Sequence, residues 1–287
     1  MGVIYKKELK GYFTGMMGYV FIAFALAVIG IYTVAVNFIQ SYPNFEYVLD
    51  SIRFLFLLLI PILTMRTMSD EKRQRTDLLL YSSPISTYSI ILGKFFAALT
   101  VFAVPFAVSC FYPLIIGRYG VVNYKVAYSA IFGFLLMGGA CIAIGIFLSS
   151  LTESQMVSAV LCFGALLLCY LMPSLSSIMP SSALSSLGGF LVLAVFFGCM
   201  INITTKNKIL SIALGGLTAA VPAAVYLIDR TALEGTFNTA MNALAVFSKF
   251  NNFIYGMFDL AAVIYFITVT LLFVFFTVQA IEKRRWS

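Results

Sequence analysis

The sequence predicts an all-helical integral membrane protein, a polytopic bundle of six to eight transmembrane helices with both termini in the cytoplasm. Two observations carry this prediction. First, 62% of the 287 residues are hydrophobic and only 10% are charged, whereas soluble domains contain about 45–50% apolar and about 25% charged residues. Second, the apolar residues gather in runs of about 20, the length that crosses a bilayer. Residues 1–287 are expected to form a single transmembrane domain.

Eight apolar runs have the length and composition of a span, so eight is the preferred count. The predicted spans are 17–38, 52–68, 86–116, 126–149, 154–173, 187–204, 208–228 and 258–281. The run 86–116 is too long for one straight span. Its first turns are therefore expected at the cytoplasmic interface, with kinks at Pro105 and Pro113.

The 18 lysines and arginines are distributed unevenly about these spans. With the N-terminus inside, the inner face collects Lys6, Lys7, Lys10, Arg66, Lys72, Arg73, Arg75, Lys94, Lys206, Lys208, Lys283, Arg284 and Arg285. The outer face holds only Arg53, Arg118, Lys125, Arg230 and Lys249. Because cytoplasmic loops carry the excess of Lys and Arg, both termini are predicted inside, which requires an even number of spans.

The chain opens on a basic and amphipathic stretch, residues 1–16. One helical stripe is formed by Tyr5, Leu9, Tyr12 and Met16, and the other side carries Lys6, Lys7 and Lys10. This pattern predicts an interfacial helix that lies on the inner leaflet and leads into the first span. A basic flank without fixed structure is the alternative.

Two of the connecting segments are distinctive. The segment 229–257 is long and semi-apolar, and it fits either short helices on the outer leaflet or a packed structural loop. The segment 174–186 is rich in Ser and Pro and is expected to be a loop.

No formally charged residue falls in the middle of a predicted span. Charged groups are costly in the bilayer and usually functional there, so their absence argues against a proton- or sodium-coupled carrier. It also argues against a membrane hydrolase, which needs paired carboxylates or a nucleophile with its base. The sequence has no histidine and five cysteines, none in a CxxC pair, which argues against a metal site. The chain is expected to be no enzyme and to bind no nucleic acid.

The most polar stretch is SDEKRQRTDLLLYSSPISTYSIILGKF, residues 69–95. A helix over 69–83 would have Ser69 as its N-cap and two acidic residues in its first turn. Its charged half is followed by the apolar block 78–81 and then by a Ser-Ser-Pro stop. A connector that merely carries basic residues is the alternative. However, an exposed apolar block needs a partner, either lipid or protein.

This stretch resembles the cytoplasmic loop of ABC-2 type permeases, the membrane subunits of ATP-driven exporters. The shared pattern is a charged start, a threonine, a leucine-rich block, a Ser-Pro turn and a Gly-Lys-Phe sequence. The residues that carry it are Asp70, Glu71, Lys72, Arg73, Thr76, Asp77, Leu78, Leu79, Leu80, Ser83, Pro84, Ile85, Ser86, Gly93, Lys94 and Phe95. Arg75 departs from the pattern, because many members carry glycine there.

Both ends of the chain also resemble this family. The last apolar run is similar to the family's last span at Gly256, Asp259, Leu260 and the basic residues before Trp286. The opening Lys-Glu-Leu at 7–9 is typical as well. The chain is nearest in character to the gliding-motility-associated permeases. Six spans per subunit are common in the family, so 187–228 would be an additional helix pair.

The resemblance implies a permease subunit in the bacterial cytoplasmic membrane, paired with a second permease copy or a paralogue. No GxxxxGK[ST] pattern occurs, so ATP and Mg²⁺ are expected on a separate ATPase subunit and no cofactor on this chain. The segment 69–83 would be the coupling helix that docks on that ATPase. The implied interface residues are Asp70, Glu71, Arg73, Arg75, Thr76, Asp77, Leu78, Leu79, Leu80, Tyr81 and Pro84, with secondary contacts from Lys6, Lys7, Glu8, Thr152 and Glu153.

Two other functions stay open at this point. One is a secondary transporter or channel that works without ATP, and the other is an ABC-type membrane anchor that transports nothing. The small residues Gly138, Gly139, Ala140 and Gly145 mark a close helix packing, either between two permeases or within one subunit.

Overall fold

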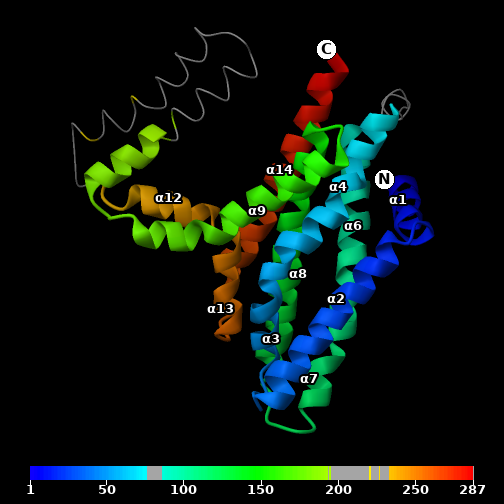
Figure 1. Ribbon diagram of the computed structural model, residues 1–287, viewed down its shortest axis with the longest axis vertical. Helices are drawn as coiled ribbons and strands as arrows, with labels where there is room; N and C mark the ends of the chain where they lie inside the picture. Colours follow the sequence, from blue (N-terminus) through cyan, green and yellow to red (C-terminus); the bar gives the residue numbers. More distant parts are fainter. Residues whose placement is uncertain (76–85, 193, 195–219, 221–225, 227–232, 287) are drawn as a thin grey trace. The chain divides into compact units, whose positions relative to one another are not determined.

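The computed structural model describes residues 1–75, 86–192, 194, 220, 226 and 233–286 (Figure 1). The described residues are helical and contain no strand, which confirms the predicted class. The main helices are α1 Gly2–Thr14, α2 Met17–Thr33, α3 Phe45–Ile52, α4 Phe56–Gln74, α6 Thr87–Ser109, α7 Phe111–Ile116, α8 Tyr124–Leu151, α9 Gln155–Ile178, α12 Thr236–Leu244, α13 Asn251–Ile254 and α14 Leu260–Trp286. A π-helical stretch, Val34–Ile39, extends α2.

Six helical segments within the described ranges are long and apolar enough to cross a membrane. They are Met17–Ile39, Phe45–Gln74, Thr87–Ile116, Tyr124–Leu151, Gln155–Ile178 and Leu260–Lys283. They match the six predicted spans outside 187–228. The additional pair was predicted at 187–204 and 208–228. The structure describes the start of its first helix, within Ala183–Val192, and 195–219 lies outside the described residues. The chain is therefore a multi-pass membrane protein.

The second of these segments begins earlier and ends later than predicted, because helix α3 and the 3-10 turn Arg53–Leu55 precede α4. Arg53 is accommodated there by two polar partners. Its Nε lies 3.1 Å from Asp50 Oδ1 and its Nη1 donates to Asn251 Oδ1 at 2.5 Å. A charged residue with these partners does not interrupt the helical path. The predicted start at 52 missed α3, because Glu46 and Asp50 lower the hydropathy of that helix.

The third segment is divided at Cys110 into α6 and α7, and Cys110 itself keeps helical dihedral angles. Proline cannot donate to the carbonyl four residues earlier, so Pro113 leaves the Ser109 carbonyl without its helical donor. Pro105 lies inside α6, which continues past it.

The chain divides into two compact units, Met1–Leu168 with Lys249–Ser287, and Cys169–Ser248. Helix α8 is the most buried span of the first unit, with 72% of its apolar window covered. Around it lies a cluster of fully buried rings, Phe56, Phe102, Phe134 and Phe250. The Phe56 and Phe134 rings are 4.5 Å apart and those of Phe134 and Phe250 are 5.4 Å apart, the range of favourable edge-to-face contacts.

The glycines of α8 bring its backbone close to two neighbouring helices. A Cβ atom at Gly138 would lie less than 3.0 Å from the Phe102 ring of α6, and one at Gly145 equally close to the Thr64 side chain of α4. Small residues permit such close approach between membrane helices. The predicted seam is thus used for packing within one subunit.

The second unit contains the end of α9, the helix Ala183–Val192 and α12. The loop predicted at 174–186 is shorter than expected, because α9 continues through Pro173 to Ile178 and the next helix begins at Ala183, which leaves 179–182 as the loop. Serine favours turns when its hydroxyl competes for backbone groups, but here Ser176 accepts from Asn242 Nδ2 at 3.1 Å. The described part of 229–257 does form short helices, as one of the two interpretations expected.

Candidate functional site

The charged start of the segment 69–95 belongs to α4 and not to a separate helix. Ser69 is therefore no N-cap: it lies inside α4, and its hydroxyl donates to the Met65 carbonyl one turn earlier. The expectation was wrong because the apolar span and the charged stretch share one uninterrupted helical path. Asp70 and Glu71 consequently lie near the C-terminal end of a helix, where the macrodipole disfavours anions, so their partners must be cations.

Helix α4 ends at Arg75, which adopts the left-handed conformation with φ 55° and ψ 21°. Its N–H donates to the Lys72 carbonyl, at 3.1 Å. A left-handed residue just after a helix is most often glycine, because a side chain is strained there. The place where many ABC-2 type permeases carry glycine is thus a helix end whose backbone favours glycine.

The variant Arg75→Gly is expected to stabilise the end of α4 by up to about 1 kcal/mol, because it relieves the left-handed strain. Slower amide exchange over residues 70–75 would show this. The matched control is Gln74→Gly, in the last helical position. Glycine there should destabilise the helix end by about 1 kcal/mol, so amide exchange should become faster. Faster exchange in both variants would contradict the left-handed end.

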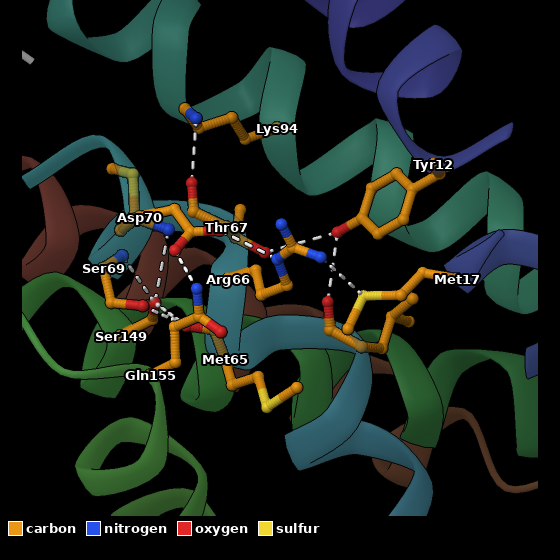
Figure 2. A network of polar contacts seen from close by, with 12 residues as sticks. Tyr12, Met17, Met65, Arg66, Thr67, Ser69, Asp70, Lys94, Ser149 and Gln155 are labelled. Carbon is orange, nitrogen blue, oxygen red and sulfur yellow. Dashed lines mark hydrogen bonds and ion pairs between the residues drawn. The ribbon is translucent and has the colours of Figure 1, made fainter. Parts of the chain in front are cut away.

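The centre of the site is Lys94, whose side chain is only 1% exposed. Its Nζ lies 3.1 Å from Glu8 Oε1 and 2.9 Å from Glu71 Oε1, and it donates to the Thr67 carbonyl at 2.8 Å. An ammonium group has three donors, and these three acceptors use all of them. One buried cation therefore joins α1, α4 and α6, as its bond to Thr67 in Figure 2 shows in part.

Helix α1 is docked by further contacts onto the same end of α4. Lys7 Nζ lies 3.4 Å from Glu71 Oε1, and the Tyr12 hydroxyl donates to the Leu63 carbonyl at 3.1 Å. Burial raises the pKa of Tyr12 to about 12, so this hydroxyl keeps its proton and stays a donor at physiological pH. The backbone of Gly93 in α6 admits Ile4, which a Cβ would meet at 3.1 Å. The predicted helix at the N-terminus is confirmed, and it packs against protein.

A second set of contacts joins α4 to the turn between α8 and α9. Asp70 accepts from Arg66 Nε at 2.8 Å and also from the Gln155 amide. The Ser149 hydroxyl lies 3.2 Å from the backbone nitrogens of Met68 and Ser69. Figure 2 shows these groups converging on one turn of α4. Lys72 reaches across and donates to the Ser150 carbonyl.

A polar cavity of about 400 Å³ opens beside these contacts. Its wall is formed by charged and small residues of α1 and α4 together with Met17 and Lys94. Within the described residues, no group of three His, Cys, Asp or Glu side chains could hold a metal ion. The site offers ion pairing and docking surfaces and shows no arrangement of a base with a nucleophile.

The structure brings together four of the residues that the sequence singled out, namely Lys7, Glu8, Asp70 and Glu71. Lys6, Arg73 and Arg75 are exposed at the same end. Thr152 and Glu153 lie in the turn before α9, where the Thr152 hydroxyl donates to the Ser154 carbonyl at 3.4 Å. The remaining predicted interface residues fall outside the described residues: Thr76, Asp77, Leu78, Leu79, Leu80, Tyr81 and Pro84.

Sequence reasoning missed Lys94 as a site residue, although a signal was present. A lysine several residues into an apolar helix, with apolar residues before and after it, is rarely buried unless it is paired. Its partners could not be inferred, because Glu8 and Glu71 lie 86 and about 23 residues away along the chain. Thr67 and Gln155 gave no signal of their own.

A comparison with protein families matches residues 31–228 to the ABC-2 family transporter proteins. The chain belongs to this family. The match spans more than half of the ABC-2 protein and includes the whole segment 69–95. It does not distinguish the gliding-motility-associated type. No curated protein and no solved structure matches this ABC-2 chain.

The family assignment fits the chemistry of the described part of the chain. An ABC-2 membrane component typically has no catalytic activity of its own, and the ionisable residues of this one are gathered at the helix ends. Figure 1 shows α1, the end of α4 and the start of α6 side by side, at the end of the first unit where both termini lie. The ABC-2 protein thus gathers Glu8, Asp70, Glu71 and Lys94 at this end, whereas Asp50 and Arg53 pair at the start of the second span.

Proposed function

We propose that this chain is the permease subunit of an ATP-driven exporter in the bacterial cytoplasmic membrane, and that ATP hydrolysis takes place on a separate subunit. The observation that carries the proposal is the continuity of α4. This helix runs from Phe56, in the aromatic core, to Gln74, directly before the segment that resembles a coupling element. Its 19 residues span about 28 Å. A displacement applied at the segment after Arg75 would therefore reach the core of the bundle.

The ion pairs around Lys94 support this role for α4. They fasten the end of α4, which precedes the proposed coupling segment in sequence, to the start of α6, which follows it, and to α1. Packed helices with such links move as bodies, which is how domain closure in a partner can reorient spans. Lys7 and Glu8 would then couple the N-terminal helix to the same motion.

The partner is proposed to be an ABC-type ATPase, which binds ATP and Mg²⁺, with a second permease copy or paralogue completing the pore. The apolar block Leu78, Leu79 and Leu80 would enter a groove of that ATPase, and the charged residues before it would set register and association rate. The support is the family match together with the resemblance of 69–95.

Co-purification tests this proposal directly. The tagged protein is co-expressed with ATPase subunits encoded beside it, in the wild type and in the double variant Leu79→Asp, Leu80→Asp. Because central apolar anchors are each worth about 2 kcal/mol or more, the double variant is expected to lose the co-eluting ATPase. The matched control Tyr119→Asp, Val121→Asp adds the same charge to the exposed turn between α7 and α8 and should keep it.

Two outcomes would overturn the proposal. If the wild type binds no ATPase and moves solute alone in liposomes, the chain is a secondary transporter or channel. If the ATPase co-elutes but no solute moves across proteoliposomes on ATP addition, the chain is an anchor and transports nothing itself.

A further inference from the structure

Two hollows meet at Met17, where α1 gives way to α2. The first is the polar cavity of about 400 Å³, which includes Met17 in its wall. The second is an apolar cavity of about 370 Å³ between α2 and α4, lined among others by Met17, Val20, Leu58 and Ile62. The two cavities share Met17 in their walls, so a hollow lined by charged side chains adjoins an apolar one, and together they are called the depression.

The change occurs along a single face of α4. Leu58, Ile62, Arg66 and Asp70 follow one another at intervals of four residues, so they lie on one side of the helix. The first two line the apolar cavity and the last two line the polar one. Each step of four residues rises about 6 Å. The change from the apolar to the charged lining therefore takes place within about one helical turn, between Ile62 and Arg66. This is the profile of a lipid at the membrane interface, with its chains and headgroup in sequence.

The charges of the polar cavity are balanced. Its basic residues are Lys7, Arg66 and Lys94, and its acidic residues are Glu8, Asp70 and Glu71. A site with both signs and no formal excess is complementary to a ligand that carries both signs itself. An anionic headgroup would bring its negative charge beside three carboxylates as well as three cations, and it would offer the carboxylates no cation in return.

Arg66 has the donors that a phosphate group needs. Its side chain is 51% exposed, its Nε is used by Asp70, and its Nη1 faces only the weak acceptor Met17 Sδ at 3.7 Å. Figure 2 shows the guanidinium between Asp70 and Met17, at the junction of the two cavities. The planar fork of arginine suits phosphate oxygens.

We propose that this depression binds one phospholipid with a zwitterionic headgroup that ends in a primary amine. Arg66 takes the phosphate, and the ammonium group lies toward the carboxylates of Glu8 and Asp70. An acyl chain fills the apolar cavity between Val20 and Leu58. The lipid would cover α2 and α4 where they diverge. This site goes beyond the proposed transport function, and its test requires no ATPase.

Lipid titration followed by native mass spectrometry tests the site. Delipidated protein in detergent is titrated with phosphatidylethanolamine, phosphatidylcholine and phosphatidylglycerol of identical acyl chains. Phosphatidylethanolamine is expected to bind with about a tenfold lower Kd than phosphatidylcholine, because a quaternary ammonium has no N–H to donate. Phosphatidylglycerol, which lacks the cation, should bind weakly as well. Equal binding of all three lipids would overturn the proposal.

Two variants probe the two ends of the site independently. Arg66→Gln should raise the Kd for phosphatidylethanolamine about tenfold, whereas the control Arg118→Gln, on an exposed outer loop, should leave it unchanged. Leu58→Trp should fill the apolar cavity and weaken all three lipids, whereas Ile31→Trp, exposed elsewhere on the α2 surface, should not. If neither Arg66→Gln nor Leu58→Trp differs from its control, the depression holds unselected bilayer lipid.

Discussion

Replacing Lys94 by methionine is expected to lower the free energy of unfolding by about 3–5 kcal/mol, the cost of removing one partner from a buried ion pair. The side chain is 1% exposed and faces two carboxylates, Glu8 and Glu71, within 3.1 Å. Methionine has a similar volume but cannot donate, so the Thr67 carbonyl loses this donor and the two carboxylates lose their buried cation, with the more exposed Lys7 still beside them. Denaturation of the purified protein in mixed micelles, followed by circular dichroism, measures the loss.

The controls for this prediction lie in the same network. Lys10→Met changes an exposed lysine of α1 and should cost less than about 0.5 kcal/mol. The triple variant Lys94→Met, Glu8→Gln, Glu71→Gln also removes the two carboxylate charges that Lys94 compensated and should recover a large part of the loss. A single variant Lys94→Met as stable as wild type would contradict the description of this residue as a buried tie between three helices.

Replacing Gly138 by alanine is expected to destabilise the bundle by about 1–3 kcal/mol, the usual cost of overpacking a core. The added Cβ would lie less than 3.0 Å from the ring of Phe102. That ring is fully buried and contacts Phe56 and Phe106, at centroid distances of 5.3 Å and 4.8 Å. It has no free direction in which to move, so α6 and α8 must separate. The temperature at which the protein loses monodispersity should fall.

The matched control is Gly164→Ala in α9, where an added Cβ would have no neighbour within 4 Å. This variant should be neutral or slightly stabilising, because alanine is the better helix former by about 0.8–1.0 kcal/mol. In the variant Phe102→Leu, the smaller side chain gives the new methyl group room. Gly138→Ala should therefore cost less stability in the Phe102→Leu background than in the wild type. Equal effects of Gly138→Ala and Gly164→Ala would show that the close approach of α6 and α8 is absent.

The spans were predictable because the bilayer imposes a length and a composition on each one separately. The first span, predicted at 17–38, is observed as Met17–Ile39, and the last, predicted at 258–281, as Leu260–Lys283. Helix ends were less predictable. Serine is a common N-cap residue, yet α4 continues through Ser69. The Ser69 hydroxyl donates to the Met65 carbonyl in the preceding turn and so does not compete for the backbone groups that continue the helix.

The candidate site was predictable only in part. Asp70 and Glu71 are conspicuous because only 10% of the residues are charged. Their position near the predicted cytoplasmic ends of the spans follows from the distribution of basic residues. Their pairing does not follow, because Lys94 reaches them from another helix and Glu8 from a third. The sequence states which charges exist near one face, and the packing of α1, α4 and α6 decides which of them meet.

The close fit of α8 against its neighbours has a consequence for how the bundle can move. Where the Phe102 ring lies over Gly138 and the Thr64 side chain over Gly145, a rotation of α8 about its axis would drive backbone into side chain. Helices α4, α6 and α8 are thus expected to move together as one rigid body. The first span, Met17–Ile39, is only 22% covered. We expect it, like Gln155–Ile178 with 17% covered, to shift relative to the body formed by α4, α6 and α8 when α4 is displaced.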